Sequence, residues 1–155
     1  FDVVIYGTGF KTNPFLASID VQGLGGRLLR EHWHGGAHAY LGITTYDFPN
    51  FYMMYGPNTN LGHNSIIIMI EAQARYIVKC IERLKMSGQK TLQVKEAVES
   101  KYNEEIQARL KKMSFADVKE SWYMDGGRIT NNWAGSTLEY RRRLRKVNWN
   151  NYLIT

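Results

Sequence analysis

The sequence predicts an α/β fold, or α+β for an isolated fragment. We expect a few short strands from the edge of a larger domain, a long helix pair and an irregular C-terminal extension. Two observations predict it. Apolar stretches at residues 2–6 and 48–55 each run into a glycine, and residues 65–86 and 94–113 repeat apolar side chains at helical spacing. A strand that ends in glycine and leads into a helix forms a cofactor shelf in α/β proteins. The backbone can approach a ligand closely there, and the helix N-terminus offers unpaired N–H groups.

The first third of the chain alternates short apolar stretches with glycines. We expect strands at residues 2–6 and 19–22 and irregular chain at residues 27–33 and 37–45. The segment 51–55 is apolar almost throughout, which is typical of a strand covered on both faces of a parallel sheet. No full G-x-G-x-x-G motif is present after the first strand, because Thr12 stands at its third glycine position.

Two helices are predicted in the middle of the chain. The first carries an apolar stripe made by Ile66, Ile70, Ile77, Ile81 and Leu84. Asn64 or Ser65 can cap its start, and Gly88 lies just beyond its end. The second repeats Val94, Val98, Tyr102, Ile106 and Leu110 on one face. We expect the two helices to form an antiparallel pair.

The C-terminal region is less regular. Residues 136–145 predict a short helix, and the aromatic, amide-rich tail at residues 148–155 is expected to pack over another surface. We divide the chain into residues 1–88, the end of a larger domain, and residues 89–155, a helical and irregular extension.

Composition limits the possible protein classes. With 155 residues and 44% hydrophobic content, the chain can bury a core. It begins inside a predicted strand, so we expect it to be a piece of a longer protein. Its longest apolar run, residues 66–70, is too short to span a bilayer. The single cysteine, Cys80, excludes an internal disulfide and favours a cytoplasmic location; we expect it to be a small buried hydrophobic residue.

The net charge of +6 is concentrated near the C-terminus. The basic cluster consists of Arg141, Arg142, Arg143, Arg145 and Lys146, and aromatic residues lie nearby. One interpretation is a nucleic-acid surface with stacking platforms. The favoured one is a solvated helix whose arginines pair with carboxylates of neighbouring domains, and an anionic dinucleotide is a third possible partner.

Histidines suggest a metal site but do not complete one. His32, His34 and His38 fall within seven residues, and His63 lies far from them. No thiol supports these histidines and no carboxylate pattern accompanies them, so we predict no metal site.

A set of short motifs resembles the C-terminal part of class B flavoprotein monooxygenases of the Baeyer–Villiger type. The matching pieces are Asp2-Val-Val-Ile-Tyr-Gly-Thr-Gly-Phe10, Phe48-Pro49-Asn50-Phe51, Gly56-Pro57-Asn58-Thr59, Glu71-Ala-Gln73 with Tyr76, Ser121-Trp122-Tyr123 and Tyr140-Arg141. They occur in the family's order over nearly the whole chain. Two features depart from the pattern: Gly7 replaces an alanine, and residues 124–130 differ from the commoner Gly-Ala-Asn-x-Pro-Gly-Lys.

The resemblance implies an enzyme that binds FAD and NADPH and inserts one oxygen atom from O2 next to the carbonyl of a small ketone, giving an ester or lactone. Residues 1–88 would then end the FAD-binding domain. Both phosphate-binding loops and the catalytic residues would lie upstream of Phe1, so we expect no catalytic residue here and no activity of this chain alone. Its expected partners are the missing FAD and NADP domains, and its uncovered apolar surface predicts self-association. Two alternatives remain: oxygenation of nitrogen or sulfur, and a non-enzymatic nucleic-acid-binding module.

The resemblance also implies cofactor-binding residues. These are Thr8, Gly9, Asn58, Thr59, Asn60, Leu61, Gly62, His63, Asn64 and Trp122. Residues 60–64 would lie beside the pyrimidine edge of the flavin, where backbone N–H groups and the helix dipole stabilise the charge of the reduced ring. Thr8 and Gly9 would lie at the crossover between the FAD and NADP domains, and Trp122 would close over NADP. The structural alternatives are a capped helix end, a tight turn and a core aromatic residue.

Overall fold

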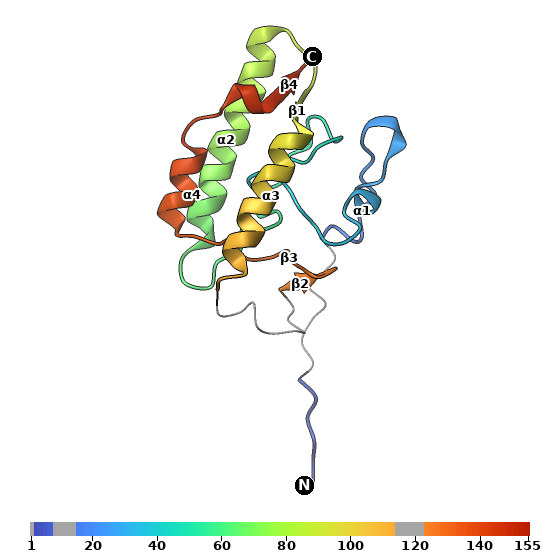
Figure 1. Cartoon of the computed structure of the whole chain (residues 1–155), viewed down its shortest axis with the longest axis vertical. Coiled ribbons are helices and arrows are strands. Elements are labelled where there is room, and N and C mark those ends of the chain that lie inside the picture. Colours follow the sequence, from blue (N-terminus) through green and yellow to red (C-terminus); the bar gives the residue numbers. More distant parts are fainter. Residues whose placement is uncertain (1, 8–14, 114–122) are drawn as a thin grey trace.

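Figure 1 shows the computed structural model, which describes residues 2–7, 15–113 and 123–155. Three helices surround an irregular middle layer: α2 (Ile66–Ser87), α3 (Glu96–Leu110) and α4 (Thr137–Leu144). The short α1 (Leu29–His32) lies to one side, and η1 (Leu24–Gly26) and η3 (Trp149–Asn151) are single 3₁₀ turns. The mixed helix and strand content agrees with the predicted class.

The long helix α2 forms where the sequence predicts it, but its most buried face is not the predicted stripe. The buried side chains are Met69, Ala72, Gln73, Tyr76 and Cys80, which follow the helical repeat. In the predicted stripe Ile81 is 52% exposed, and the other members, Ile66, Ile70, Ile77 and Leu84, are only half-buried. Gly88 ends the helix in the left-handed region, at φ 68°, where a side chain would add strain. Burial of Cys80 confirms its role as a small hydrophobic residue.

The strands are short and antiparallel. β1 (Leu92–Val94) pairs with β4 (Tyr152–Ile154), and β2 (Met124–Asp125) pairs with β3 (Arg128–Ile129). Because β1 occupies residues 92–94, α3 begins at Glu96, two residues later than the periodicity predicts. The C-terminal tail therefore packs within the chain, where the Tyr76 and Tyr152 hydroxyls form a 2.8 Å hydrogen bond.

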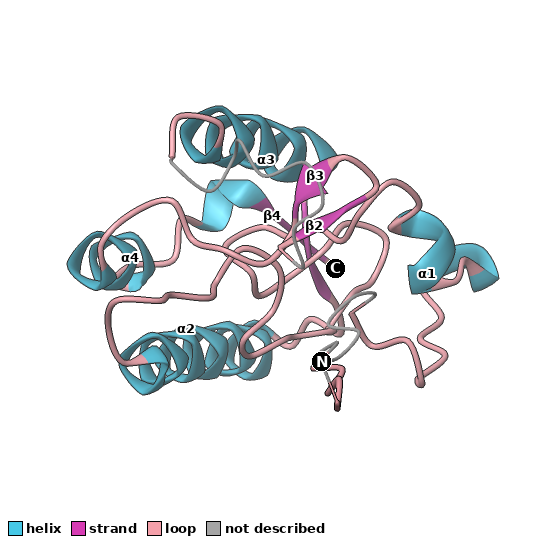
Figure 2. Ribbon diagram, turned by 90° about the horizontal axis from the view of Figure 1, so that it is seen from below, coloured by secondary structure: helices cyan, strands magenta, loops and turns pink. Residues whose placement is uncertain are grey.

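The predicted helix pair is arranged differently. α2 and α3 run in opposite directions, but the middle layer separates them and α4 is the helix that packs against α2 (Figures 1 and 2). Both helices still contribute to one core, which contains Met69, Tyr76, Ile106 and Leu110. A second, smaller core gathers around Leu29, Trp33 and Phe48.

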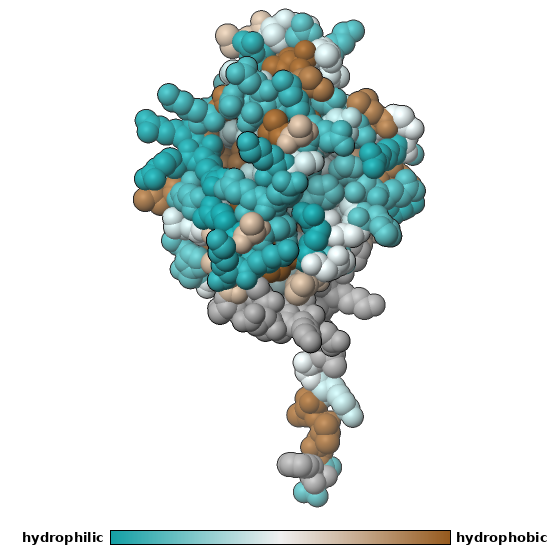
Figure 3. Space-filling model, viewed as in Figure 1, coloured by the Kyte–Doolittle hydropathy of each residue, from teal (hydrophilic) through white to brown (hydrophobic). Residues whose placement is uncertain are grey.

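Three predicted strands are not strands in the structure. Residues 2–7 project from the body with exposed apolar side chains, and Ile5 is 89% exposed (Figures 1 and 3). Residues 51–55 are irregular, and residues 19–22 make a single bridge, between Gln22 and Leu28. Conversely, the predicted irregular stretch at residues 27–33 contains α1. A strand needs a continuous hydrogen-bonded neighbour. In the described chain residues 19–22 and 51–55 make only isolated backbone bonds, such as the one from the Met53 N–H to the Ile43 carbonyl at 2.8 Å.

No helix within the described ranges is both long enough and apolar enough to cross a membrane.

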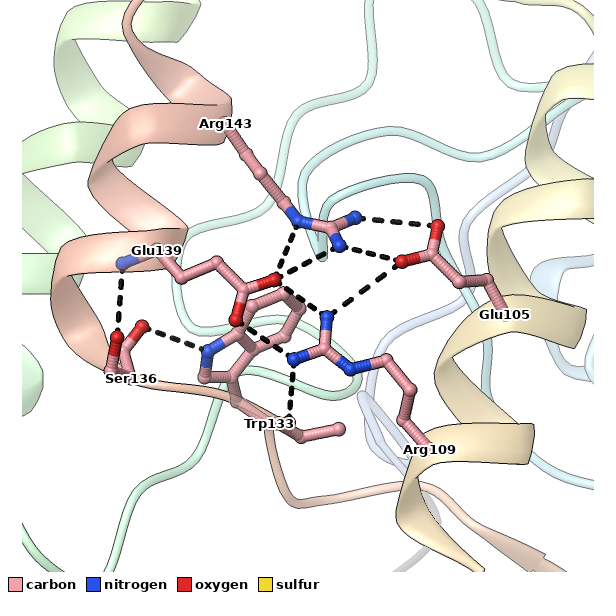
Figure 4. A network of polar contacts seen from close by, with 7 residues as sticks. Glu105, Arg109, Trp133, Ser136, Glu139 and Arg143 are labelled. Carbon is pink, nitrogen blue, oxygen red and sulfur yellow. Dashed lines mark hydrogen bonds and ion pairs between the residues drawn. The ribbon is translucent and has the colours of Figure 1, made fainter.

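An ion-pair network joins α3 to α4 (Figure 4). Arg109 donates to both oxygens of Glu139, at 2.6 and 2.8 Å, and Arg143 donates to Glu139 at 3.0 Å and Glu105 at 2.5 Å. Both guanidinium groups lie over the Trp133 ring, 5.6 and 5.5 Å from its centroid. Arg143 therefore pairs with carboxylates of this chain, whereas the sequence analysis favoured neighbouring domains as its partners.

Replacing Glu139 should change how stability responds to acid. Hydrogen bonds from Arg109 hold the pKa of Glu139 down at about 2, against an ordinary value of 4.5. The contribution of Glu139 to the free energy of unfolding is therefore complete above pH 4.5 and is lost as the pH falls towards 2. Since Glu139 is partly exposed, we expect E139Q to lower the free energy of unfolding by about 1 kcal/mol at pH 7 and by less at low pH.

Urea unfolding at several pH values measures this effect. The matched control is Glu104→Gln, which removes an exposed carboxylate of α3. A constant difference between wild type and E139Q across the acid range would contradict the assignment.

Candidate functional site

The segment 58–64 passes from the core to the surface just before α2. Asn58 and Thr59 are buried, Asn60 and Leu61 are half-buried, and residues 62–64 are exposed. The predicted cofactor-binding segment thus divides into a buried anchor, residues 58–60, and an exposed rim, residues 61–64.

Asn58 forms the base of the anchor. Its backbone lies in the left-handed region at φ 58°, a conformation that asparagine tolerates better than most residues. Its side-chain amide donates to the carbonyls of Ile129 (2.7 Å) and Asn132 (3.1 Å). Thr59 Oγ1 donates to the Gly56 carbonyl at 2.7 Å. Both side chains make hydrogen bonds inside the chain, so they hold the rim in position.

Asn60 completes the anchor by pairing with the C-terminal half of the chain. It forms a parallel bridge with Asn132. Its N–H donates to the Asn131 carbonyl at 3.0 Å, and its carbonyl accepts from the Trp133 N–H at 2.8 Å. The sequence shows Asn131 and Asn132 as an ordinary polar turn, so nothing in their pattern indicates this contact.

Two glycines allow the anchor to approach the middle layer. A Cβ at Gly42, where φ is 64°, would lie 2.1 Å from Thr59 Cγ2. A Cβ at Gly56 would lie 2.4 Å from the Gly42 carbonyl oxygen. Neither space admits a side chain, so the glycine in the predicted turn serves this close approach.

A buried polar relay supports the chain before the anchor. Gln73 of α2 accepts a hydrogen bond from the Tyr55 N–H at 2.9 Å and donates to the Tyr140 hydroxyl at 2.8 Å. Tyr140 in turn donates to the Leu41 carbonyl at 2.6 Å. Burial raises the pKa of Tyr140 far above its ordinary value, so the hydroxyl keeps its proton. The sequence motifs contain Gln73 and Tyr140, but only the fold joins them.

The rim is open. Among the described residues, leaving out its two chain neighbours, none has an atom within 4 Å of a Cβ at Gly62, and His63 is exposed. Asn64 accepts from the Ser65 N–H and donates to Thr137 Oγ1, both at 2.7 Å, which ties the rim to α4. The Ser65 side chain does not cap α2, and the first turn of α2 contains no acidic residue. Its N–H groups and positive dipole end can therefore stabilise an anion.

Exposed apolar side chains lie in the segments on either side of the rim. Met54 and Ile67 are 56% and 59% exposed, and Tyr55 is also exposed. The predicted site residues Thr8, Gly9 and Trp122 fall outside the described residues.

Comparison with curated proteins identifies relatives, although no protein-family model matches. An FAD-binding monooxygenase of Aspergillus niger is 43% identical over 160 residues. A Baeyer–Villiger monooxygenase of Streptomyces coelicolor is 38% identical over 156 residues. Each alignment covers 99% of this chain but only 26% and 30%, respectively, of the relative. The chain therefore spans less than a third of the length of these relatives.

Solved structures with the same fold are also monooxygenases. An oxidized steroid monooxygenase bound to NADP matches with a TM-score of 0.77 and 25% identity, over 87% of this chain and 26% of that one. A protein designated OTEMO, in complex with FAD and NADP, matches with a TM-score of 0.76 and 26% identity, over 88% of this chain and 26% of that one.

We expect Gln73→Leu to destabilise the protein by about 2–3 kcal/mol, because it leaves the Tyr55 N–H and the Tyr140 hydroxyl without their partner. Exposed Gln89→Leu is the control. Urea unfolding of Q73L, Tyr140→Phe and the double variant measures the coupling within the relay. Additive effects of the two substitutions would show that the relay does not act as a unit.

Proposed function

Because this chain belongs to the Baeyer–Villiger monooxygenase family, as its C-terminal part, we propose that the whole protein is an FAD- and NADPH-dependent enzyme. It would insert one oxygen atom from O2 next to the carbonyl of a small ketone and release an ester or lactone. The names of the relatives and the cofactors in the solved structures support this proposal. We also propose a cytoplasmic location.

The observation that carries the proposal is the open rim at the start of α2. A reduced flavin carries negative charge along its pyrimidine edge, and a helix start without an acidic residue suits that charge. When bound, the flavin supplies the oxygen-transfer chemistry. The residues of this chain would position the ring: the anchor would hold the rim, and backbone N–H groups near His63 and Asn64 would stabilise the charged edge.

We propose that the exposed apolar surface is covered by the missing FAD and NADP domains. Residues 1–88 would complete the FAD-binding domain, and residues 89–155 would extend it. Val3 to Tyr6 would enter its sheet as a strand, which accounts for their exposure here. Thr8 and Gly9 would lie at the crossover between the domains, and Trp122 would cover NADP. An isolated chain should self-associate through the same surface.

The activity is tested on the full-length gene product. We expect ketone consumption that requires both NADPH and O2, and no bound FAD or activity in the 155-residue chain alone. A sulfide and an amine substrate run in parallel distinguish oxygenation of heteroatoms. Stoichiometric flavin bound to the isolated chain would contradict the proposal that most of the FAD site lies in the missing domains. A full-length product without bound flavin would overturn the proposed function.

The rim is tested by placing a charge at the helix start. Ser65→Asp should cap α2 favourably and leave the fold intact, yet repel the negative edge of the reduced flavin. We expect the flavin reduction potential to fall by about 20–40 mV, since about 1–2 kcal/mol corresponds to that shift for a two-electron couple. Ser65→Asn caps without charge and is the matched control. Equal flavin reduction potentials in Ser65→Asp and Ser65→Asn would show that the rim does not lie beside the flavin.

A further inference from the structure

Two histidines and one buried glutamate meet at a place unrelated to the rim. His32 comes from α1, His38 from the loop after it, and Glu99 from α3. One potential ligand atom from each lies within 4.8 Å of the other two. The two imidazole rings have centroids 5.0 Å apart, and Glu99 is 3% exposed. No carboxylate pattern accompanies these histidines in the sequence, and the fold brings Glu99 to them from a distant helix.

The hydrogen bonds of His38 determine which of its nitrogens is free. Nδ1 lies 3.2 Å from the Gly36 carbonyl, which can only accept, so Nδ1 carries the proton. Burial lowers the pKa of His38, which favours the neutral ring. Nε2 therefore holds a lone pair, and it points towards Glu99 Oε1 at 3.8 Å. Two electron-rich atoms facing each other at this distance are stabilised by a cation between them.

His32 supplies another lone pair to the cluster, in addition to that of His38 Nε2. The Thr45 hydroxyl donates its one proton to Glu99 Oε1 at 2.9 Å, so His32 Nε2, at 3.2 Å from Thr45 Oγ1, must be the donor in that contact. In a neutral imidazole whose Nε2 carries the proton, Nδ1 holds the lone pair, and burial lowers the pKa of His32, which favours the neutral ring. This Nδ1 is buried and has no hydrogen-bond partner in the described part of the chain. Such an orphaned acceptor requires an explanation, and a bound ion is one.

The carboxylate is held for coordination. Glu99 Oε1 accepts from Thr45, and Oε2 accepts from the Tyr46 N–H at 2.6 Å. These contacts orient Glu99 as outer-shell partners orient metal ligands. A cavity of about 140 Å³ adjoins the cluster and is also lined by Ser100 and Glu96. It has room for water as a further ligand.

We propose that His32, His38 and Glu99 bind a divalent transition-metal ion of the zinc class. Two imidazoles, one carboxylate and an open position form a ligand set that this class accepts. The ion would link α1 and the following loop to α3, and this proposal does not depend on the flavin.

Arginines nearby give the competing explanation. Arg27 is paired with Asp47 at 3.0 Å. Arg128 has two buried nitrogens without a hydrogen-bond partner among the described residues, and its charge acts on Glu99. If Arg128 alone balances Glu99, no metal is needed. The experiment must therefore distinguish charge compensation of Glu99 by a bound metal ion from compensation by the Arg128 guanidinium group.

Cobalt(II) is the probe, because its d–d absorption reports coordination at wavelengths beyond the flavin bands. The full-length gene product is stripped with a chelator and titrated with Co²⁺. We expect d–d bands to appear in the wild type and in His34→Gln, an exposed histidine of the same segment. His32→Gln, His38→Gln and Glu99→Gln should lose these bands and weaken Co²⁺ binding by at least about tenfold.

A thermal measurement keeps the proposal falsifiable if these variants fold poorly. Co²⁺ should raise the melting temperature of wild type and H34Q, because binding to the native state stabilises it. Absence of both d–d bands and a thermal shift in wild type would overturn the proposal. Unchanged Co²⁺ binding in H38Q, when this variant has the circular dichroism spectrum of the wild type, would also overturn it. The same holds if H34Q loses as much Co²⁺ binding as H38Q.

Discussion

The pairing of the anchor with residues 129–133 is the constraint on which the candidate site depends. Two segments far apart in sequence lie side by side here, joined by Asn58, the bridge between Asn60 and Asn132, and the Trp133 N–H. These bonds satisfy backbone groups of the irregular middle layer, and the Ile129 carbonyl also accepts from Gln107. The rim projects from this pairing, so its position is determined by the C-terminal half of the chain.

The irregular architecture explains why buried polar contacts are prominent. Short strands satisfy few backbone groups, and Gln73, Tyr140 and Glu99 take over part of that role. Trp133 links the anchor to the ion pairs between α3 and α4, since its N–H bonds Asn60 and its ring lies beneath Arg109. The helices and the site are thus stabilised by one connected set of interactions.

The molecule presents an anion-favouring helix start among exposed apolar side chains in the neighbouring segments. This combination suits a planar cofactor with one charged edge, more than a nucleic acid. Within the basic cluster, Arg143 is occupied by Glu105 and Glu139. Arg141, Arg142 and Arg145 line a groove between α2 and α4 that includes no residue of the rim. The basic groove and the candidate cofactor segment therefore share no residue.

The sequence by itself determined α2, α3 and α4, the burial of Cys80, and the similarity to Baeyer–Villiger monooxygenases, because helical periodicity, caps and ordered motifs are local signals. Only the tertiary structure decided that residues 51–55 are irregular and that the tail pairs as β4. It alone brought Asn60 to Asn132, and His38 to Glu99. These outcomes depend on hydrogen-bonding neighbours from distant parts of the chain, and no local pattern of side chains specifies which neighbour will be there.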